Sequence, residues 1–580
     1  MQNSTAYLTY PSNQTKRFSH SLGTMHLSGQ MIYYSIINSD ESTREKLFSQ
    51  IRTQITTILD DPESRTSLNI ILDKYTNILD NLDFKTNIDD SLYRLNTPQI
   101  INKEQVFLYQ VLLQSVRCAA LLHDVGHPPF SHITEYALSQ ICSELKQVED
   151  CKLTPRQKHF LEIVNKTGSI ELHEKIGFEI ASRLLKSIIP KHESTSESAY
   201  ITLFYWIVYR FTESILNEDT PLFGDIHRVV AGAVDGDRLD YITRDLANSG
   251  FACGKIEYDR LICTMKLIEN EGRFGFCTSV QTLSILEDFF QRRMRLYKYL
   301  IFHHRVIKTD YLLGQTIVKL SLDYLNITSK EDPRPNNGLP LDISGLWKAI
   351  YNTYSNNSYF NALIQWDDAW LLTVLKQQFF EKYEHSTEII KYQLEEILSN
   401  RKNYTSIIKR LDDFIEIDTV VFDKFSKGLE GILGKVGEEF KPKLEKLQHH
   451  DNVFSGLYLN RIKKDIFQLF RREEQFQEII KSTIKAQAIK VGASDCIVVF
   501  KKIKTGIEGP PFIYKENDLI TLDDVSSIRL SLELSSETFP TFFVYIMESK
   551  KIDRMQFLKD LGEQISQNLI QELNNMFFKN

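Results

Sequence analysis

The sequence predicts a mainly α-helical protein with a small C-terminal lobe of mixed helix and strand. Over most of the 580 residues, apolar side chains recur at spacings of three and four, the repeat of a half-buried helix. Only 24 glycines and 15 prolines are spread over this length, too few for the turns of an all-β fold. After about residue 490, short β-branched and aromatic runs replace the helical pattern.

The helical part is expected to consist of two regions. Residues 1–325 are predicted to form a core, interrupted at about 40–105 by a polar helical segment that has the character of an insertion. The stretch 325–338 contains two prolines and several polar residues, which is typical of a loop or linker. Residues 326–490 then return to charged helical patterning and are interpreted as a helical extension.

The C-terminal lobe is predicted to cover residues 491–580. The runs 496–502, 511–515 and 542–546 are rich in β-branched and aromatic residues, and turn residues separate them, which predicts short strands. A final amphipathic helix is expected over about 553–577.

Composition excludes several classes of protein. The net charge of −7 argues against a polycation built for nucleic acid. Seven cysteines, none of them in a CxxC pair, favour a reducing compartment without a disulfide framework. The N-terminus lacks a basic region followed by an apolar one, and no apolar run approaches the roughly 20 residues that cross a bilayer. We therefore expect a cytoplasmic protein with no membrane partner.

The most informative segment is 121–132, Leu-Leu-His-Asp-Val-Gly-His-Pro-Pro-Phe-Ser-His. The leading leucines predict a buried helix end, and the glycine and prolines break the helix directly after His123 and Asp124. A lone buried histidine is usually an ordinary core residue. Burying this many titratable groups, however, costs several kcal/mol unless they are paired or bound to a metal. A divalent metal site is the simplest explanation.

A second polar segment lies at 234–245. Asp237, Tyr241 and Asp245 recur every four residues, so a helix would place them on one face, with Arg238 and Arg244 beside them. A solvated charged helix is the ordinary interpretation of such a face. The apolar stretch that precedes the segment, and the tyrosine within it, favour a cleft instead.

Two distant residues are candidates to complete a His-His-Asp-Asp ligand set around His123 and Asp124. They are His20, in the segment Arg-Phe-Ser-His-Ser-Leu-Gly at 17–23, and Asp237.

Together these segments resemble the HD superfamily of metal-dependent phosphohydrolases, and more narrowly its dGTPase-like branch, the deoxynucleoside triphosphate triphosphohydrolases. That branch carries R-F-x-H-S-L-G, H-D-x-G-H-x-P-F-S-H and D-x-D-[RK]-x-D-Y-x-x-R-D segments in this order, and residues 17–23, 123–132 and 235–245 match them. The resemblance covers most of the chain except 40–105, and it extends more loosely to the C-terminal lobe. It implies an HD-domain helical core.

The resemblance also implies roles for individual residues. The metal ligands would be His20, His123, Asp124 and Asp237, and imidazole with carboxylate suits Mg²⁺, Mn²⁺ or Fe²⁺. Five residues would be catalytic. His132 would act as general acid, His127 and His173 would lie near the phosphates, and Glu135 and Glu174 would orient these histidines. The substrate contacts would be Arg17, Arg238, His303, His304 and Arg305 for the triphosphate, Tyr241 and Asp245 for the deoxyribose, and Gln2 for the 3′-hydroxyl.

The expected reaction is hydrolysis of a deoxynucleoside triphosphate to a deoxynucleoside and inorganic triphosphate. A homo-oligomer is expected as well. Regulated members of the family have a region before the glutamine that bears part of an allosteric nucleotide site. Because this chain begins almost at Gln2, either the start is truncated or that regulatory site is missing.

Two alternatives stay open. The first is a phosphohydrolase that acts on another nucleotide or on the ends of single-stranded nucleic acid. The second is a nucleotide-binding sensor without turnover. The intact ligand set argues against the sensor.

Overall fold

The chain folds into two compact units, each assembled from separate stretches of sequence. Unit 1 comprises residues 1–293, 320–374 and 506–526, and unit 2 comprises residues 294–319, 375–505 and 527–580. The computed structural model describes residues 3–74, 96–165, 172–191, 196–251, 256–328, 339–354, 358–399, 401–449, 457–470, 473–507, 512–516, 518–548 and 552–578. Helices dominate both units, so the prediction of a mainly α fold is confirmed.

This arrangement differs from the predicted division into 1–325, 326–490 and 491–580. The helix α14 (His304–Leu325) begins in unit 2 and ends in unit 1, so a boundary at its last residue does not separate the units. Residues 506–526 belong to unit 1 because β5 (Phe512–Lys515) pairs with β2 (Arg273–Ser279). Backbone pairing over this sequence distance leaves no local signal in the chain.

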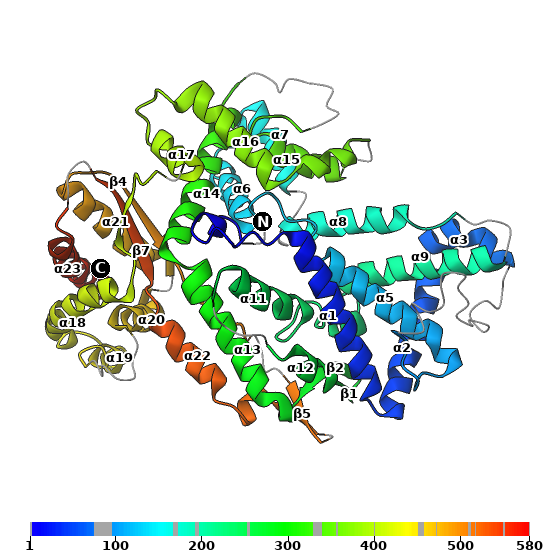
Figure 1. Cartoon of the computed structure of the whole chain (residues 1–580). Coiled ribbons are helices and arrows are strands. Elements are labelled where there is room, and N and C mark those ends of the chain that lie inside the picture. Colours follow the sequence, from blue (N-terminus) through cyan, green and yellow to red (C-terminus); the bar gives the residue numbers. More distant parts are fainter. Residues whose placement is uncertain are drawn as a thin grey trace. The chain divides into compact units, whose positions relative to one another are not determined.

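In unit 1, α1 and α5 pack against each other (Figure 1). α1 also contacts α11, and α5 contacts α9. The helices assigned wholly or mainly to unit 1 are α1 (Arg17–Ile37), α2 (Glu41–Asp60), α3 (Pro62–Lys74), α5 (Val106–Leu122), α6 (His132–Lys146), α7 (Pro155–Asn165), α8 (Leu172–Ser187), α9 (Ser196–Asn217), α10 (Pro221–His227), α11 (Gly236–Asn248), α12 (Tyr258–Cys263), α13 (Leu283–Leu296), α15 (Gly345–Tyr354) and α16 (Asp368–Gln378).

The central helix α5 is buried along most of its length, as its nearly continuous apolar sequence requires. It ends at Leu122, where the sequence predicted a helix end. Among the described residues, one helical stretch, Lys103–Leu122, is long and apolar enough to cross a membrane, and 61% of it is buried inside the protein. The core helix of a protein without membrane spans can have the same length and hydropathy.

Small residues bring α1 and α11 together. A Cβ atom on Gly236 would lie 2.2 Å from Ser28 Oγ and 3.0 Å from the Thr24 carbonyl oxygen, so only glycine fits at this crossing. Asp235 caps α11, because its carboxylate accepts hydrogen bonds of 2.6 Å from the backbone N–H groups of Gly232 and Arg238. The first turn of α11 is therefore held against the middle of α1.

The segment 40–105 contributes to the core of unit 1 through α2. Its apolar residues are buried, with Phe48 2% exposed and Ile51 fully buried, and α2 packs on α5 and α9. At the start of α3, Ser64 Oγ accepts a hydrogen bond of 2.8 Å from the buried indole of Trp206. Residues 75–95 of the predicted insertion lie outside the described residues.

Unit 1 also contains a four-stranded sheet in the order β1-β2-β5-β6, formed by β1 (Lys266–Asn270), β2, β5 and β6 (Asp518–Thr521). The sequence analysis predicted β5 but not the hairpin β1–β2. Its turn uses Glu271 and Gly272, both with positive φ.

Unit 2 is built on a three-stranded antiparallel sheet in the order β3-β7-β4, with β3 (Thr405–Ile408), β4 (Ala493–Phe500) and β7 (Phe542–Glu548). β4, β7 and the last helix α23 lie where strands and a helix were predicted. α21 packs on β4 and α23 packs on α18 (Figure 1). With α14, the unit contains α17 (Ile389–Ser399), α18 (Leu411–Leu433), α19 (Lys441–Glu445), α20 (Tyr458–Phe470), α21 (Glu473–Lys490), α22 (Ile528–Glu537) and α23 (Arg554–Phe578).

Candidate metal centre

Three helix ends in unit 1 bring the four predicted metal ligands together. His20 lies in the first turn of α1, and Asp237 lies in the first turn of α11. His123 and Asp124 follow directly after the last residue of α5. The crossing of α1 with α5 and with α11 thus joins side chains that are more than 200 residues apart in sequence.

The ligand atoms lie within a few ångströms of one another. Asp237 Oδ1 is 2.8 Å from His20 Nε2 and 3.4 Å from His123 Nε2. Asp124 Oδ1 is 3.5 Å from His123 Nε2, and Asp124 Oδ2 is 4.0 Å from His20 Nε2. One ligand atom each from His20, His123 and Asp124 falls within 4.8 Å of the others. This spacing is compatible with a single cation bound by all four side chains.

The two Nε2 atoms are the strongest sign that a cation fits here. The Nε2 atoms of His20 and His123 are both buried, and neither has a well-aligned hydrogen-bond partner, although Asp237 Oδ1 lies 2.8 Å from the first and 3.4 Å from the second. Buried ring nitrogens without a hydrogen bond are costly. A divalent ion would use the lone pairs of both nitrogens and the charge of both carboxylates, so the donor set fits such an ion.

Electrostatics in this cluster is dominated by burial and by the pairing of imidazole with carboxylate. Burial would lower the pKa of His20, but the carboxylates of Asp237 and Asp240 outweigh it and raise this pKa to about 10. For His123 burial also lowers the pKa, but Asp124 and Asp237 raise it to about 9. The pKa of Asp237 falls to about 2, because the two histidines overcome the effect of its burial. A bound metal would have to displace protons from both imidazoles.

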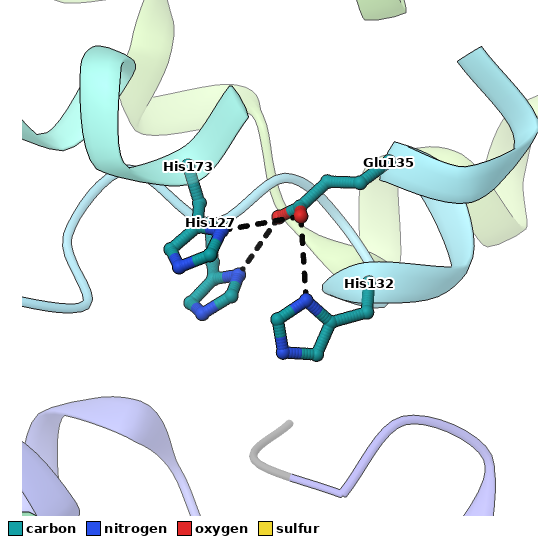
Figure 2. A group of neighbouring side chains, drawn as sticks. All are labelled: His127, His132, Glu135 and His173. Carbon is teal, nitrogen blue, oxygen red and sulfur yellow. Dashed lines mark hydrogen bonds and ion pairs between the residues drawn. The ribbon is translucent and has the colours of Figure 1, made fainter. Parts of the chain in front are cut away.

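A second cluster lies beside the first and consists of His127, His132, Glu135 and His173 (Figure 2). All three imidazoles turn Nδ1 toward the carboxylate of Glu135, at 3.0 Å for His127, 3.3 Å for His132 and 3.1 Å for His173. The rings of His127 and His173 stack with centroids 4.0 Å apart. Burial would raise the pKa of Glu135, but the three histidines hold it well below its ordinary value.

This arrangement leaves the Nε2 atom of each histidine directed away from Glu135. The side chain of His132 is 54% exposed, whereas that of His127 is 5% exposed. His127 Nε2 lies 3.3 Å from Asp124 Oδ1, so it links the second cluster to the metal ligands. His132 is therefore the member of the cluster most accessible to a substrate.

Arg17 lies next to both clusters. Its guanidinium donates to Asp124 Oδ2 at 2.8 Å and to the hydroxyl of Ser131. The ring centroid of Tyr241 lies 6.4 Å from that of His20. Asp245 is one turn further along α11 and 1% exposed, and burial raises its pKa to about 6. Of the predicted substrate contacts, Arg17 and Tyr241 therefore each lie next to a proposed metal ligand.

The remaining predicted site residues have other surroundings. The guanidinium of Arg238 donates to the Gly506 carbonyl at 2.7 Å and lies 3.5 Å from Asp235. Glu174 is exposed at the start of α8. His303, His304 and Arg305 belong to unit 2, where His304 Nδ1 is 3.2 Å from Ser406 Oγ. Gln2 lies outside the described residues.

Asp240 and Ser131 were not among the residues predicted for the site, although both touch it. Asp240 Oδ2 lies 2.8 Å from His20 Nδ1. The signal in the sequence was the pair Asp240 and Arg244, an aspartate and an arginine four residues apart on the same helix as a predicted ligand. Ser131 gave no comparable signal.

Comparison with known proteins agrees with this geometry. Residues 105–223 match the family model described as HD domain. The matched range begins just before α5 and includes His123, Asp124 and all of the second cluster. The chain therefore carries an HD domain.

Individual relatives are distant. The chain is 24% identical over 319 residues to an uncharacterized protein, MJ1154, of Methanocaldococcus jannaschii, covering 52% of this chain and 58% of that protein. It is 25% identical over 192 residues to the deoxynucleoside triphosphate triphosphohydrolase SAMHD1 of Gallus gallus, covering 32% of this chain and 28% of that protein. The alignments thus span less than two thirds of either relative. A crystal structure of a phosphohydrolase from Bacteroides thetaiotaomicron, 15% identical, aligns over 94% of this chain and 91% of its own with a TM-score of 0.45.

Proposed function

We propose that this protein is a metal-dependent hydrolase that converts deoxynucleoside triphosphates to deoxynucleosides and inorganic triphosphate. The observation that carries the proposal is the convergence of two imidazoles and two carboxylates beside a cluster of three further histidines. The similarity to the triphosphohydrolase of Gallus gallus supports the choice of substrate.

The cation would be held by His20, His123, Asp124 and Asp237. When bound, a divalent ion such as Mg²⁺, Mn²⁺ or Fe²⁺ polarises a phosphoryl oxygen and activates water. Arg17, already paired with Asp124, offers a fixed positive charge next to this position. Arginine suits this task because its planar guanidinium bonds phosphate oxygens in a bidentate manner.

His132 is proposed as the group that protonates the leaving group. Water adds to the α-phosphorus, the bond between that phosphorus and the sugar 5′-oxygen breaks, and this oxygen takes up a proton. The side chain of His132 is 54% exposed, and its Nδ1 lies 3.3 Å from Glu135 Oε2. Glu135 thus orients the ring, and Nε2 is the atom that would donate a proton to the leaving oxygen. His127 and His173 are proposed to face the phosphates.

Tyr241 and Asp245 are proposed to contact the sugar. Both residues are on α11, and the Tyr241 ring lies 6.4 Å from the ring of His20 on α1, which supports this role. We expect the tyrosine ring to exclude a 2′-hydroxyl. Contacts from Arg238, Glu174, Gln2 and residues 303–305 to the substrate stay predictions, as does the homo-oligomer.

The test is a product analysis with purified protein. The protein is loaded with Mn²⁺ or Mg²⁺ and incubated with each of the four deoxynucleoside triphosphates and with their ribonucleotide counterparts, and the products are separated by ion exchange. We expect inorganic triphosphate and deoxynucleoside, a preference for 2′-deoxy substrates, and no product after addition of a chelator.

Asp124→Ala and Asp237→Ala should each reduce the rate by at least about 10³-fold, because each removes a negatively charged ligand. Asp150→Ala is the matched control, since Asp150 is a surface carboxylate that pairs with Lys158 at 3.0 Å, and it should keep the rate of the unmodified protein. Release of pyrophosphate or monophosphate, or tight nucleotide binding without any product, would refute the proposal. The first outcome would favour another phosphohydrolase, and the second a sensor.

A further inference from the structure

The ring nitrogen of His20 that faces away from the metal position has a buried carboxylate partner. His20 Nδ1 lies 2.8 Å from Asp240 Oδ2, the His20 side chain is fully buried, and the Asp240 side chain is 8% exposed. Asp240 comes from α11, one turn after the ligand Asp237. The imidazole is therefore fixed from both sides by the same helix.

Asp240 is in turn held by Arg244. The guanidinium donates from Nε to Asp240 Oδ2 at 2.8 Å and from Nη2 to Asp240 Oδ1 at 2.6 Å. Both residues are on α11, four positions apart. Such a bidentate contact fixes the plane of the carboxylate, and with it the direction in which Oδ2 can accept a hydrogen bond.

Gly23 provides the room for this pair on the opposite helix. It lies on α1, almost one turn after His20. A Cβ atom there would be 1.9 Å from Asp240 Oδ1 and 2.8 Å from Arg244 Nη2. Any side chain at this position would push the carboxylate away from its present place against α1. The close approach at Gly23 is an observation separate from the hydrogen bonds of Asp240, and it concerns the same contact between Asp240 and α1.

We propose that Asp240 is a positioning residue, which holds His20 with its Nδ1 protonated and its Nε2 directed at the metal. Arg244 orients the Asp240 carboxylate, and the lack of a side chain at Gly23 leaves room for it. This inference rests on the proposed function for the presence of a metal at the cluster. A carboxylate behind a metal-bound histidine fixes the ring orientation and makes the ligand more basic, and its removal typically weakens metal binding 10- to 100-fold.

A purely structural role would give a different result. Most aspartate–arginine pairs four residues apart on a helix contribute only slightly to stability. Asp288 and Arg292 on α13 form such a pair at 2.6 Å and provide a matched control. If Asp240 only stabilised its helix, Asp240→Ala and Asp288→Ala would both leave the affinity for metal unchanged.

The experiment measures Mn²⁺ binding by isothermal titration calorimetry on the full chain, without any nucleotide. We expect Asp240→Ala and Gly23→Ala to weaken Mn²⁺ binding about 10- to 100-fold. Asp240→Asn should recover part of the loss, because its amide oxygen can still accept the hydrogen bond that Nδ1–H donates. Asp288→Ala should stay within about twofold of the unmodified protein. A folded Asp240→Ala protein with unchanged affinity would overturn the proposal.

A second readout does not depend on metal binding. With ¹⁵N-labelled histidine, the His20 Nδ1 proton should give a downfield, slowly exchanging resonance, assigned by its loss in His20→Gln. Asp240→Asn and Gly23→Ala should shift this resonance or bring it into fast exchange, and they provide the test if Asp240→Ala does not fold. An unchanged resonance in both would overturn the inference. Mn²⁺ binding and this resonance without any triphosphate release would refute only the proposed function.

Discussion

At the scale of single residues, Gly126 determines how closely the turn after α5 approaches α8. A Cβ atom on Gly126 would lie 2.1 Å from both the Gly177 nitrogen and the His173 carbonyl oxygen. These are backbone atoms, which cannot rotate away as the end of a side chain can. The contact sets the position of His173 next to His127, and so the shape of the histidine cluster.

We therefore expect Gly126→Ala to displace the first turn of α8. The free energy of unfolding should fall by about 1–3 kcal/mol, the usual cost of overpacking. Triphosphate release should fall at least about tenfold as His173 moves away from Glu135. Gly431→Ala controls for the change of residue type, because nothing lies within 4 Å of the added methyl group, and it should not reduce stability or activity. Equal behaviour of the two variants would contradict this account.

Many residues of the candidate site could be predicted from the sequence. His20, His123, Asp124 and Asp237 could be selected because each belongs to a dense polar segment whose burial would be costly without a partner. The positioning contacts could not be predicted in the same way. The approach of Asp240 to His20 depends on the crossing of two helices, and no spacing along the chain encodes it.

At the scale of elements, the helix ends decide where the chemistry lies. The end of α5 followed from local sequence, because Gly126, Pro128 and Pro129 come directly after it and interrupt the helical pattern. The depth of α2 in the core did not, because its polar composition resembles that of a surface segment. The hairpin β1–β2 was missed for a related reason, since strand preference depends strongly on the neighbouring strands.

In unit 2, Asp418 on α18 connects this helix to the start of α20. Its buried carboxylate accepts hydrogen bonds of 2.7 Å from the backbone N–H groups of Tyr458 and Leu459 at the start of α20. Burial raises its pKa from 3.8 to about 6, although these two hydrogen bonds oppose the shift. The folded state therefore holds this proton more tightly than the unfolded state does. The resulting stabilisation is complete below pH 3.8 and is lost as the pH rises through 6.

Between pH 4.5 and pH 7.5 we expect Asp418 to account for a loss of about 2 kcal/mol in the free energy of unfolding. Asp418→Asn cannot titrate, so its stability should change less over this range. Urea denaturation of both proteins at the two pH values measures their free energies of unfolding. The other titrating groups contribute equally to both proteins, so their contributions cancel when the two pH dependences are compared. Parallel pH dependences would show that this carboxylate keeps an ordinary pKa.

At the scale of the whole molecule, the candidate metal site lies in unit 1. All four proposed ligands and the histidine cluster lie within residues 1–293, whereas unit 2 has its own core around α18, α21 and α23. The predicted homo-oligomer and cytoplasmic location concern the molecule as a whole, and they stay predictions.

Metal binding should therefore protect one unit more than the other. At a Mn²⁺ concentration of 100 times Kd, the folded state gains about 2.7 kcal/mol. We expect hydrogen exchange to slow in α1, α5 and α11 but not in the helices of unit 2. Asp124→Ala should abolish this slowing, and Asp150→Ala should retain it. Equal protection of both units would show that they unfold together, and no protection would argue against the metal site.

The sequence by itself determined the mainly helical fold, the end of α5 and the residues from which the site is built. These properties depend on local periodicity, on helix-breaking residues and on the cost of burying polar groups, which are readable along the chain. Only the tertiary structure decided which side chains face each other. It divided α14 between the two units, it joined β5 to unit 1, and it placed Asp240 behind His20. Such contacts arise from helix crossings and strand pairing between distant segments, where the geometry of close packing, and not local preference, selects the partner.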